Sequence, residues 1–276
     1  FAECYRRSDV LPLGSGALAG VVYEIDREFV ADELGFSRIS ENSIDAVADR
    51  DFVVDFLSAA ALTMTHVSRL AEEIILWSSA EFGFLELPEE FATGSSIMPQ
   101  KRNPDVAELA RGRTGRVFGD LLALLTTLKG LPLAYNRDLQ EDKLVLFDAV
   151  DVLMPSLDVF AAMLPGLRFD AARLEAAAEG GYALATDLAD YLVRQGLPFR
   201  EAHQAVAGLV DYARERGKTL RELTLEEYRR FSPHFAEDVL GLDLRASLSA
   251  RDVPGGTAPK RVVAALKRAR KSLEAS

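Results

Sequence analysis

The sequence contains little cysteine, histidine and tryptophan, and less basic than acidic charge. Its 276 residues include one Cys, three His and one Trp, and 32 Lys+Arg stand against 43 Asp+Glu, for a net charge of −11. Nucleic acids and anionic membrane surfaces are bound chiefly through Lys and Arg, so this balance argues against both as partners. Cys4 has no disulfide partner within the chain, which excludes an internal disulfide framework and predicts a cytoplasmic location.

Long apolar runs and long polar–apolar alternations are also missing. Stretches such as Leu121–Leu125 are far shorter than the roughly 20 residues that a membrane-spanning helix needs. Val, Ile and Thr do not alternate with polar residues over any length, whereas apolar residues recur every three to four positions, which is the helical period. The sequence therefore predicts an all-α fold built on a bundle of long helices.

Two long helices are predicted on either side of a non-periodic stretch. The first runs from Asp51 to about Trp77, and its apolar stripe comprises Phe52, Phe56, Ala60, Met64, Val67, Leu70 and Ile74. The second starts with Asn103 as N-cap and Pro104 as its first helical residue, and it ends at Gly130. Its apolar stripe comprises Val106, Leu109, the stem of Arg113, Val117, Leu121 and Leu125.

Glycine and proline make two further predictions. Gly112, Gly115 and Gly119 each cost the second helix about 0.5–1 kcal/mol relative to alanine, and we expect close helix packing to compensate. A third helix is predicted from about Asp138, with a kink or restart at Pro155. Beyond it the helices shorten and glycine becomes frequent. We expect a central helical-bundle domain at residues 1–174 and a small helical C-terminal domain at residues 175–276, where Thr224–Glu227 fits a capping box.

The non-periodic stretch from Leu87 to Pro104 carries most of the polar chemistry. Loops of this length in compact domains are usually functional or disordered. Lys101 and Asn103 stand at a helix start, where free N–H groups and the helix dipole favour anions, so together they could hold a carboxylate with Ser95 or Ser96 near the reacting carbon. The alternative is a polar surface loop in which Asn103 only caps its helix.

The segment Gly94–Pro104 resembles the signature loop of the fumarase/aspartase superfamily, helical-bundle lyases that release fumarate. Its sequence is GSSIMPQKRNP, and its extension to Gly115 resembles the argininosuccinate lyase branch. Three further segments resemble the same branch: Leu11–Gly20, Asn42–Asp51 and Leu131–Lys143. The resemblance is densest over residues 11–145.

This resemblance implies elimination of argininosuccinate to arginine and fumarate. Ser95 would remove the proton from the carbon next to a carboxylate, and Lys101 would supply a positive charge to that carboxylate, with Asn103 adding hydrogen bonds. Glu108 matches a glutamate that pairs with a catalytic histidine in the family; otherwise it is a first-turn acid favoured by the helix dipole. Arg102 is expected to point to solvent. The residues matching those that hold the amino-acid end of the substrate are Tyr135, Gln140 and Lys143.

The family's histidine segment, Gly-x-Thr-His-x-Gln, is absent from this chain. Thr65–His66 is a partial match, but Val67 follows it within an amphipathic helix, which favours a packing role for His66. We therefore expect that an N-terminal portion supplying the histidine precedes Phe1 and that these 276 residues alone are inactive. In the superfamily each active site is built from three subunits of a homotetramer, which implies the same assembly here.

Two other functions fit part of the pattern. One is another fumarate-releasing lyase of the same fold, such as an adenylosuccinate lyase; Gln100 and the Tyr135–Lys143 segment favour argininosuccinate over it. The other is a non-catalytic structural descendant resembling the delta-crystallins, against which the intact Ser95, Lys101 and Asn103 argue. We see no cluster of metal ligands and no glycine-rich phosphate loop, so no metal and no cofactor are expected.

Overall fold

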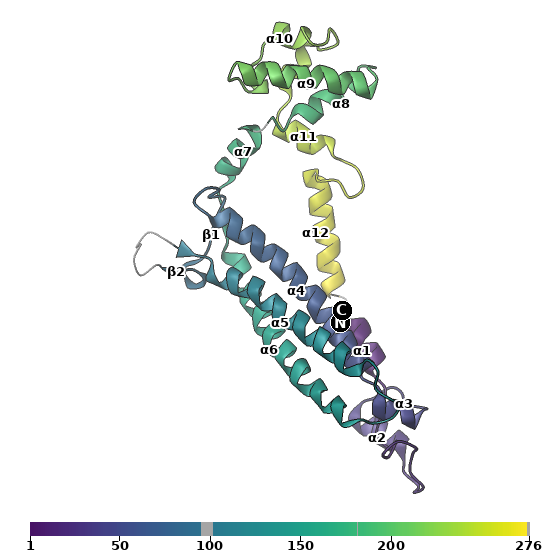
Figure 1. The fold of residues 1–276 in the computed structure, drawn as a ribbon. Helices are drawn as coiled ribbons and strands as arrows, with labels where there is room; N and C mark the ends of the chain where they lie inside the picture. The colour runs from purple at the N-terminus through teal and green to yellow at the C-terminus, as the bar shows by residue number, and fades with distance from the viewer. Residues whose placement is uncertain (95–101, 181, 275–276) are drawn as a thin grey trace. The chain divides into compact units, whose positions relative to one another are not determined.

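The computed structural model describes residues 1–94, 102–180 and 182–274, and it is mainly helical, which confirms the expected fold class (Figure 1). The chain forms two compact units, Phe1–Phe169 and Asp170–Ser276. The domain boundary expected between residues 174 and 175 falls inside α7 (Ala171–Gly180), the first helix of the second unit. Within the described ranges, no helix combines the length and the apolar character needed to cross a bilayer.

Three long helices form the first unit: α4 (Asp51–Ser78), α5 (Asp105–Leu128) and α6 (Asp142–Met163), with α5 packed against both of the others. The bounds of α4 agree with the sequence prediction to within a residue at each end. The fully or almost fully buried core between the helices comprises Val53, Leu57, Ala60, Met64, Val67, Ala71, Ile74, Ala107, Ala110, Val117, Leu124, Ala149, Val152, Leu153, Phe160 and Met163.

The start of α5 differs from its prediction. Asn103 does not cap the helix; it lies in a short strand opposite Thr93, and this pairing keeps its backbone extended, so that α5 begins at Asp105 with Pro104 as N-cap. The buried face is also partly different. Ala107, Ala110 and Thr114 are buried together with Val117 and Leu124, whereas the predicted stripe members Leu109, Arg113 and Leu125 are exposed.

Helix α6 starts four residues later than predicted, because Arg137–Glu141 forms a 3-10 turn, η2, in front of it. Pro155 lies inside α6, and the helix continues through it to Met163 without the predicted restart. The predicted packing role of His66 is wrong, since this residue is exposed on α4.

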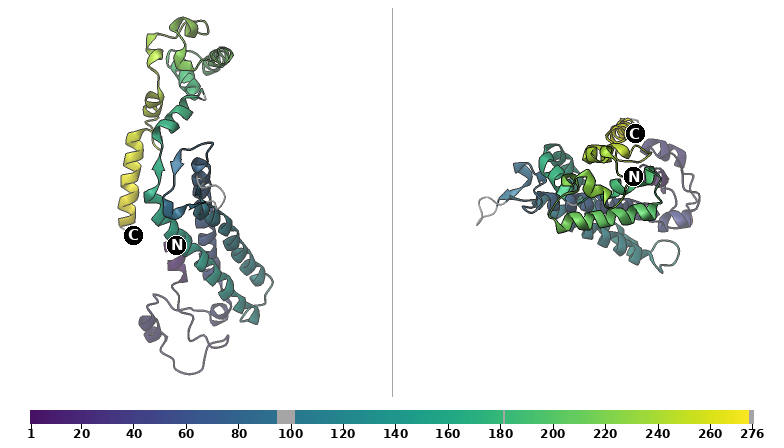
Figure 2. Two further views of the ribbon diagram at one scale, coloured as in Figure 1. Left: turned by 90° about the vertical axis from the view of Figure 1, so that its left-hand side faces the viewer. Right: turned by 90° about the horizontal axis from the view of Figure 1, so that it is seen from above.

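The N-terminal segment begins with a helix that packs on α4 and then extends beyond one end of the bundle (Figure 2, left). It comprises α1 (Ala2–Ser8), α2 (Arg27–Leu34) and α3 (Ser43–Ala48). The Asn42 side chain accepts hydrogen bonds from the amides of Ile44 and Asp45 and so caps α3.

Short strands and turns lie at the other end of the bundle (Figure 1). Strand β1 (Leu85–Glu86) pairs antiparallel with β4 (Arg168–Phe169), and β2 (Thr93–Gly94) pairs antiparallel with β3 (Arg102–Asn103). Two 3-10 turns complete this end, η1 (Glu89–Phe91) and η3 (Leu164–Gly166).

The second unit has a hydrophobic core of its own, formed between shorter helices. After α7 come α8 (Ala185–Arg194), α9 (Phe199–Glu215), α10 (Leu225–Arg229), α11 (Leu244–Ala250) and α12 (Pro259–Glu274), with the 3-10 turns η4 (Leu220–Glu222) and η5 (Glu237–Gly241). The predicted capping box is confirmed: the Thr224 side chain accepts from the amide of Glu227, and the Glu227 carboxylate accepts from the amide of Thr224.

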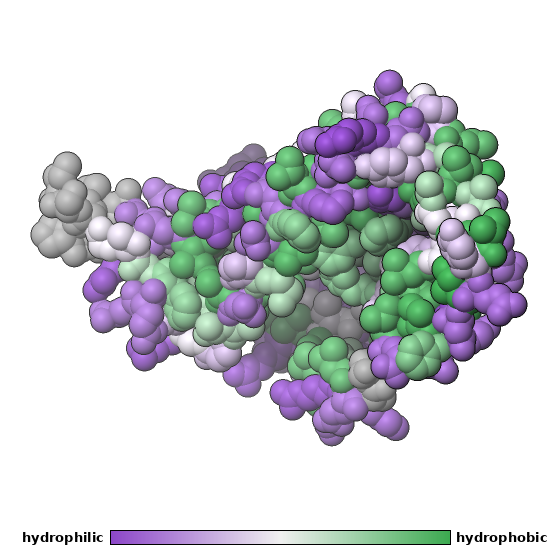
Figure 3. All heavy atoms as spheres, turned by 90° about the horizontal axis from the view of Figure 1, so that it is seen from below, coloured by the Kyte–Doolittle hydropathy of each residue, from purple (hydrophilic) through white to green (hydrophobic). Residues whose placement is uncertain are grey.

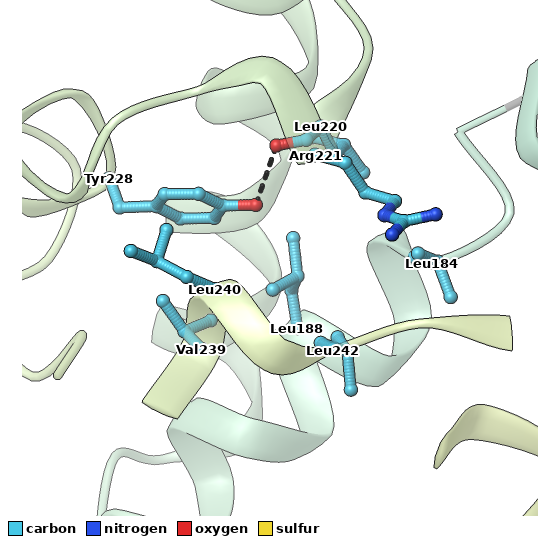
Figure 4. Close-up of a pocket in the computed structure, with 8 residues that line it drawn as sticks. All are labelled: Leu184, Leu188, Leu220, Arg221, Tyr228, Val239, Leu240 and Leu242. Atoms are coloured by element: carbon cyan, nitrogen blue, oxygen red, sulfur yellow. Dashed lines mark hydrogen bonds between the residues drawn. The ribbon is translucent and has the colours of Figure 1, made fainter. Parts of the chain in front are cut away.

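A small cavity of about 10 Å³ lies in this second core, between Leu188, Val239 and Tyr228 (Figure 4). The Tyr228 hydroxyl donates a hydrogen bond of 2.8 Å to the carbonyl of Leu220. Burial raises the pKa of this hydroxyl to about 12. The cavity holds about one water at most, so it is a packing defect of the core and not a ligand site.

Candidate active site

A two-residue ladder closes the base of the signature loop. Thr93 pairs with Asn103 and Gly94 with Arg102, so the strands bring the residues that flank segment 95–101 together in front of α5. Ser95, Ser96 and Lys101 lie outside the described residues, and their roles stay predictions. Arg102 is exposed, as expected, and its guanidinium forms an ion pair of 2.9 Å with Glu89.

Two predicted residues follow the loop directly. Asn103 is half-buried in β3, and Glu108 is exposed in the first turn of α5, where its amide donates to the carbonyl of Pro104 at 3.0 Å. Asp105 shares that first turn. Carboxylates at this position are stabilised by the helix dipole, and the exposed Glu108 carboxylate is also free to meet a group from outside this unit.

The residues expected at the amino-acid end of the substrate lie together elsewhere, between α5 and α6. Tyr135 is 47% exposed and follows Ala134, whose φ of 71° lies in the left-handed region that non-glycine residues rarely adopt. The side-chain amide of Asn136 donates to the carbonyls of Pro132 and Ala134, at 3.1 and 3.2 Å, and holds this turn. Asn136 therefore supports the turn, a role that the sequence analysis did not assign to it.

Gln140 and Lys143 follow on the same stretch. Gln140 is exposed in η2, and Lys143 is exposed in the first turn of α6. The Lys143 ammonium lies 3.1 Å from Oδ1 of Asp142. Its partly compensated positive charge therefore faces solvent at the start of α6.

A buried ion pair stands behind Lys143. Oδ2 of Asp142 accepts from Nε of Arg50 at 2.5 Å, and the Arg50 guanidinium also donates to the carbonyl of Asp49 at 2.6 Å. The side chains of Arg50 and Asp142 are only 14% and 8% exposed. The partners are 92 residues apart in the chain, so no local spacing in the sequence could have revealed the pair.

An open groove lies beside Lys143 and the Arg50–Asp142 pair, and its lining does not include Tyr135 or Gln140. It has a volume of about 1840 Å³, and its lining includes Pro12–Gly16, Arg27, Asp49, Arg50, Asp142 and Lys143. Burial raises the pKa of the Asp49 carboxyl, and its oxygen Oδ1 accepts from the amide of Asp51. Figure 3 shows the molecule from below, with apolar side chains exposed among the charged ones. Among the residues that line the groove, Leu13 and Phe147 are exposed apolar side chains.

The structure thus places the predicted residues at two ends of the bundle. Asn103 and Glu108 lie at the start of α5, whereas Tyr135, Gln140 and Lys143 lie beyond its end. At about 1.5 Å per residue, the 24 residues of α5 separate them by about 36 Å. One chain does not bring the two sets together. Among the described residues, no group of three or more His, Cys, Asp or Glu side chains could hold a metal ion.

Comparisons with known proteins show what the chain is similar to. Residues 1–119 match a family model described as lyase, and residues 182–249 match one described as argininosuccinate lyase C-terminal. The argininosuccinate lyase of Desulforudis audaxviator is 61% identical over 99% of this chain and 60% of its own length. An EDDS lyase variant with bound fumarate superposes with a TM-score of 0.87 at 31% identity, over 99% of this chain and 56% of that one.

The fold extends to more distant proteins. A class II fumarase from Schistosoma mansoni superposes with a TM-score of 0.69 at 20% identity, over 86% of this chain and 54% of the fumarase chain, which shows a shared fold. The chain spans about three fifths of the length of the curated relatives that it matches. The loop, both matched models and the relatives give one result: this chain belongs to the argininosuccinate lyase family of the fumarase/aspartase superfamily.

Proposed function

We propose that the complete protein is an argininosuccinate lyase that eliminates arginine from L-argininosuccinate and releases fumarate. The observation that carries this proposal is the 54–61% identity to curated argininosuccinate lyases over almost all of the chain. The match of residues 182–249 to the argininosuccinate lyase C-terminal model favours this branch over other fumarate-releasing lyases.

The chemistry requires a proton to leave a carbon next to a carboxylate. Ser95, ionised at its hydroxyl, would accept the Cβ proton, and the bond from Cα to the guanidino nitrogen would then break. The nitrogen would leave with the electron pair of that bond and take up one proton, which gives arginine and fumarate. Negative charge accumulates on the adjacent carboxylate before the bond breaks. Lys101 and Asn103 would hold that carboxylate, and their effect on the rate comes from the charge that develops in the transition state.

Tyr135, Gln140 and Lys143 would bind the amino-acid end of the substrate. Lys143 presents an exposed ammonium beside the groove, and the buried Arg50–Asp142 pair fixes the backbone behind it. Because the signature loop of the same chain is about 36 Å away, this site would be completed by the loop of a second subunit.

The long helices carry the surface that such an assembly needs. Side chains that are 47–68% exposed on α4–α6 include Leu62, Leu109, Phe118, Leu122 and Leu144. A Cβ added at Gly112, Gly115 or Gly119 would meet nothing within 4 Å, so the close packing expected there is not made within this chain. We therefore propose a cytosolic homotetramer in which other subunits cover these faces and the active sites are shared between chains.

The test is fumarate release by the complete protein from argininosuccinate, with adenylosuccinate as the competing substrate. We expect turnover of the first and none of the second. Ser95→Ala should lower kcat by a factor of about 10² to 10⁴, the contribution typical of a general base, while Ser96→Ala is the matched control. Rapid turnover by the Ser95→Ala variant would reject the mechanism, and turnover of adenylosuccinate alone would reject the substrate.

A further inference from the structure

The segment Pro12–Gly16 forms part of the wall of the groove that contains Lys143. It enters the fold through Leu11, which is fully buried and pairs with Ile39 in a parallel bridge. The amide of Leu11 donates to the carbonyl of Arg38, and its carbonyl accepts from the amide of Ser40. Beyond Leu11 this ladder ends, and the groove wall depends on other contacts for its shape.

Within the segment, the Ser15 hydroxyl donates to the carbonyl of Pro12 at 2.7 Å, and the amide of Gly20 donates to the carbonyl of Ser15. The side chain of Arg27 links the segment to its surroundings from the first turn of α2. Nε donates to the carbonyl of Leu13 at 2.9 Å, and Nη1 donates to the carbonyl of Ser40 at 3.0 Å. Nη2 donates to the hydroxyl of Ser40 at 2.8 Å and to the carbonyl of Leu11 at 3.4 Å. One guanidinium thus links Leu11 and Leu13 to Ser40 through hydrogen bonds.

Gly14 allows this close approach. Its φ of +90° disfavours any side chain, and a Cβ at this position would lie 2.8 Å from Cδ and Nε of Arg27. No ion pair forms between Arg27 and any carboxylate of the described residues, so its interactions here are hydrogen bonds to oxygens of the groove wall. The arrangement uses donors fixed in one plane, which a lysine ammonium does not offer.

We propose that Arg27 is a positioning residue of the substrate site: it fixes the segment Leu11–Gly16 as the wall of the groove beside Lys143, so that the amino-acid end of the substrate meets a preformed surface. The inference rests on the proposed function of this groove. A wall that only binds contributes equally to the ground state and the transition state, so its loss raises KM and leaves kcat unchanged.

The experiment compares Arg27→Lys and Gly14→Ala with the wild type in the complete protein. Lysine keeps the charge but cannot make the same set of hydrogen bonds, and alanine at position 14 displaces the Arg27 side chain. Each variant should raise KM for argininosuccinate about tenfold, with kcat within about threefold of the wild type. Arg245→Lys, an exposed arginine of α11, is the matched control and should change neither constant.

A second measurement does not depend on activity. Amide hydrogen exchange over residues 13–16 should be faster in Arg27→Lys than in the wild type, while exchange in the core of α4 is unchanged. Wild-type KM and unchanged exchange in Arg27→Lys would overturn the proposal. So would a loss of kcat at constant KM. Absence of fumarate release by the wild type would instead reject the proposed function, and the exchange measurement would then still decide whether Arg27 fixes the segment.

Discussion

The pKa of the Asp120 carboxyl is raised above its usual range by the surroundings of this residue. Oδ2 of Asp120 is buried and has no hydrogen-bond partner in the described part of the chain. Burial, and after it the nearby Asp148 on α6, raise the pKa of this carboxyl to about 6, although Arg116 on α5 acts in the opposite direction. Arg116 is itself paired with Asp148. The folded state therefore favours protonation of Asp120 more than the unfolded state does.

The sign of the resulting pH dependence follows from the raised pKa. The stabilising contribution of the protonated carboxyl is complete below its unfolded pKa, near 3.8, and is lost as pH rises through about 6. Asp120→Asn should remove this loss. The unfolding midpoint of the variant, relative to that of the wild type, should therefore rise between pH 5 and 8. Thermal unfolding monitored by circular dichroism measures it, with the exposed Asp151→Asn as control; parallel curves for Asp120→Asn and the wild type would contradict the assignment.

Glu227 shows the opposite shift. Its pKa is lowered to about 2 by the backbone hydrogen bond from Thr224 and by the ammonium of Lys218, which lies 2.9 Å from Oε1. The stability that the charged form provides is present above its unfolded pKa, near 4.5, and is lost as pH falls through about 2. Glu227→Gln should lower the unfolding midpoint of the second unit at pH 7 and flatten its acid dependence. Glu237→Gln in η5 is the control, and an unchanged midpoint at pH 7 would count against the capping role.

At the scale of elements, α5 has two apolar faces. One face packs on α4 and α6 through residues such as Ala107 and Val117, and the other presents Gly112, Gly115 and Gly119 beside the exposed Leu122. The apolar stripe predicted from the sequence combined residues of both faces. Large apolar residues dominate a periodic pattern, whereas the buried residues of α5 include the small Ala107, Ala110 and Thr114. This explains why Leu109 and Leu125 were expected in the core.

A substitution on the glycine face should have opposite effects on the stability of an isolated bundle and on that of the proposed tetramer. In an isolated bundle, Gly115→Ala should stabilise α5 by about 0.5–1 kcal/mol, because alanine is the better helix former. In the proposed tetramer the added methyl group would intrude on a closely packed partner helix, and we expect the variant to dissociate at higher protein concentration than the wild type. Sedimentation equilibrium measures this, and a tetramer tightened by the substitution would contradict the packing that we propose.

The sequence predicted some elements far better than others, for physical reasons. The bounds of α4 were predicted correctly because its pattern is uninterrupted and its start carries polar residues. The start of α5 was not predicted correctly. Asparagine is a good N-cap residue by type, but the sequence does not reveal that Asn103 pairs with Thr93 in a strand. At the candidate site the motif indicated Lys143, but the pair of Arg50 and Asp142 behind it arises only when distant segments meet.

At the scale of the whole molecule, the shared active sites that we propose predict complementation between inactive variants. A Ser95→Ala chain keeps its Lys143 cluster intact, and a Lys143→Ala chain keeps its loop intact. Mixed tetramers of the two would therefore contain some sites with both halves unaltered. Refolding the two variants of the complete protein together should restore a fraction of wild-type fumarate release, whereas each refolded alone stays inactive. Recovery no greater than the sum of the separate variants would show that one chain supplies the whole site.

The fixed distance between the two clusters has a consequence for the length of the chain. The length of α5 sets this distance. Removing a single residue would shorten the helix by about 1.5 Å and rotate the residues beyond the deletion by about 100° around its axis. In the tetramer that we propose, every active site would lose its alignment, because each site combines residues from both ends of this helix. We expect insertions to be tolerated in the turns that join the helices but not within α5.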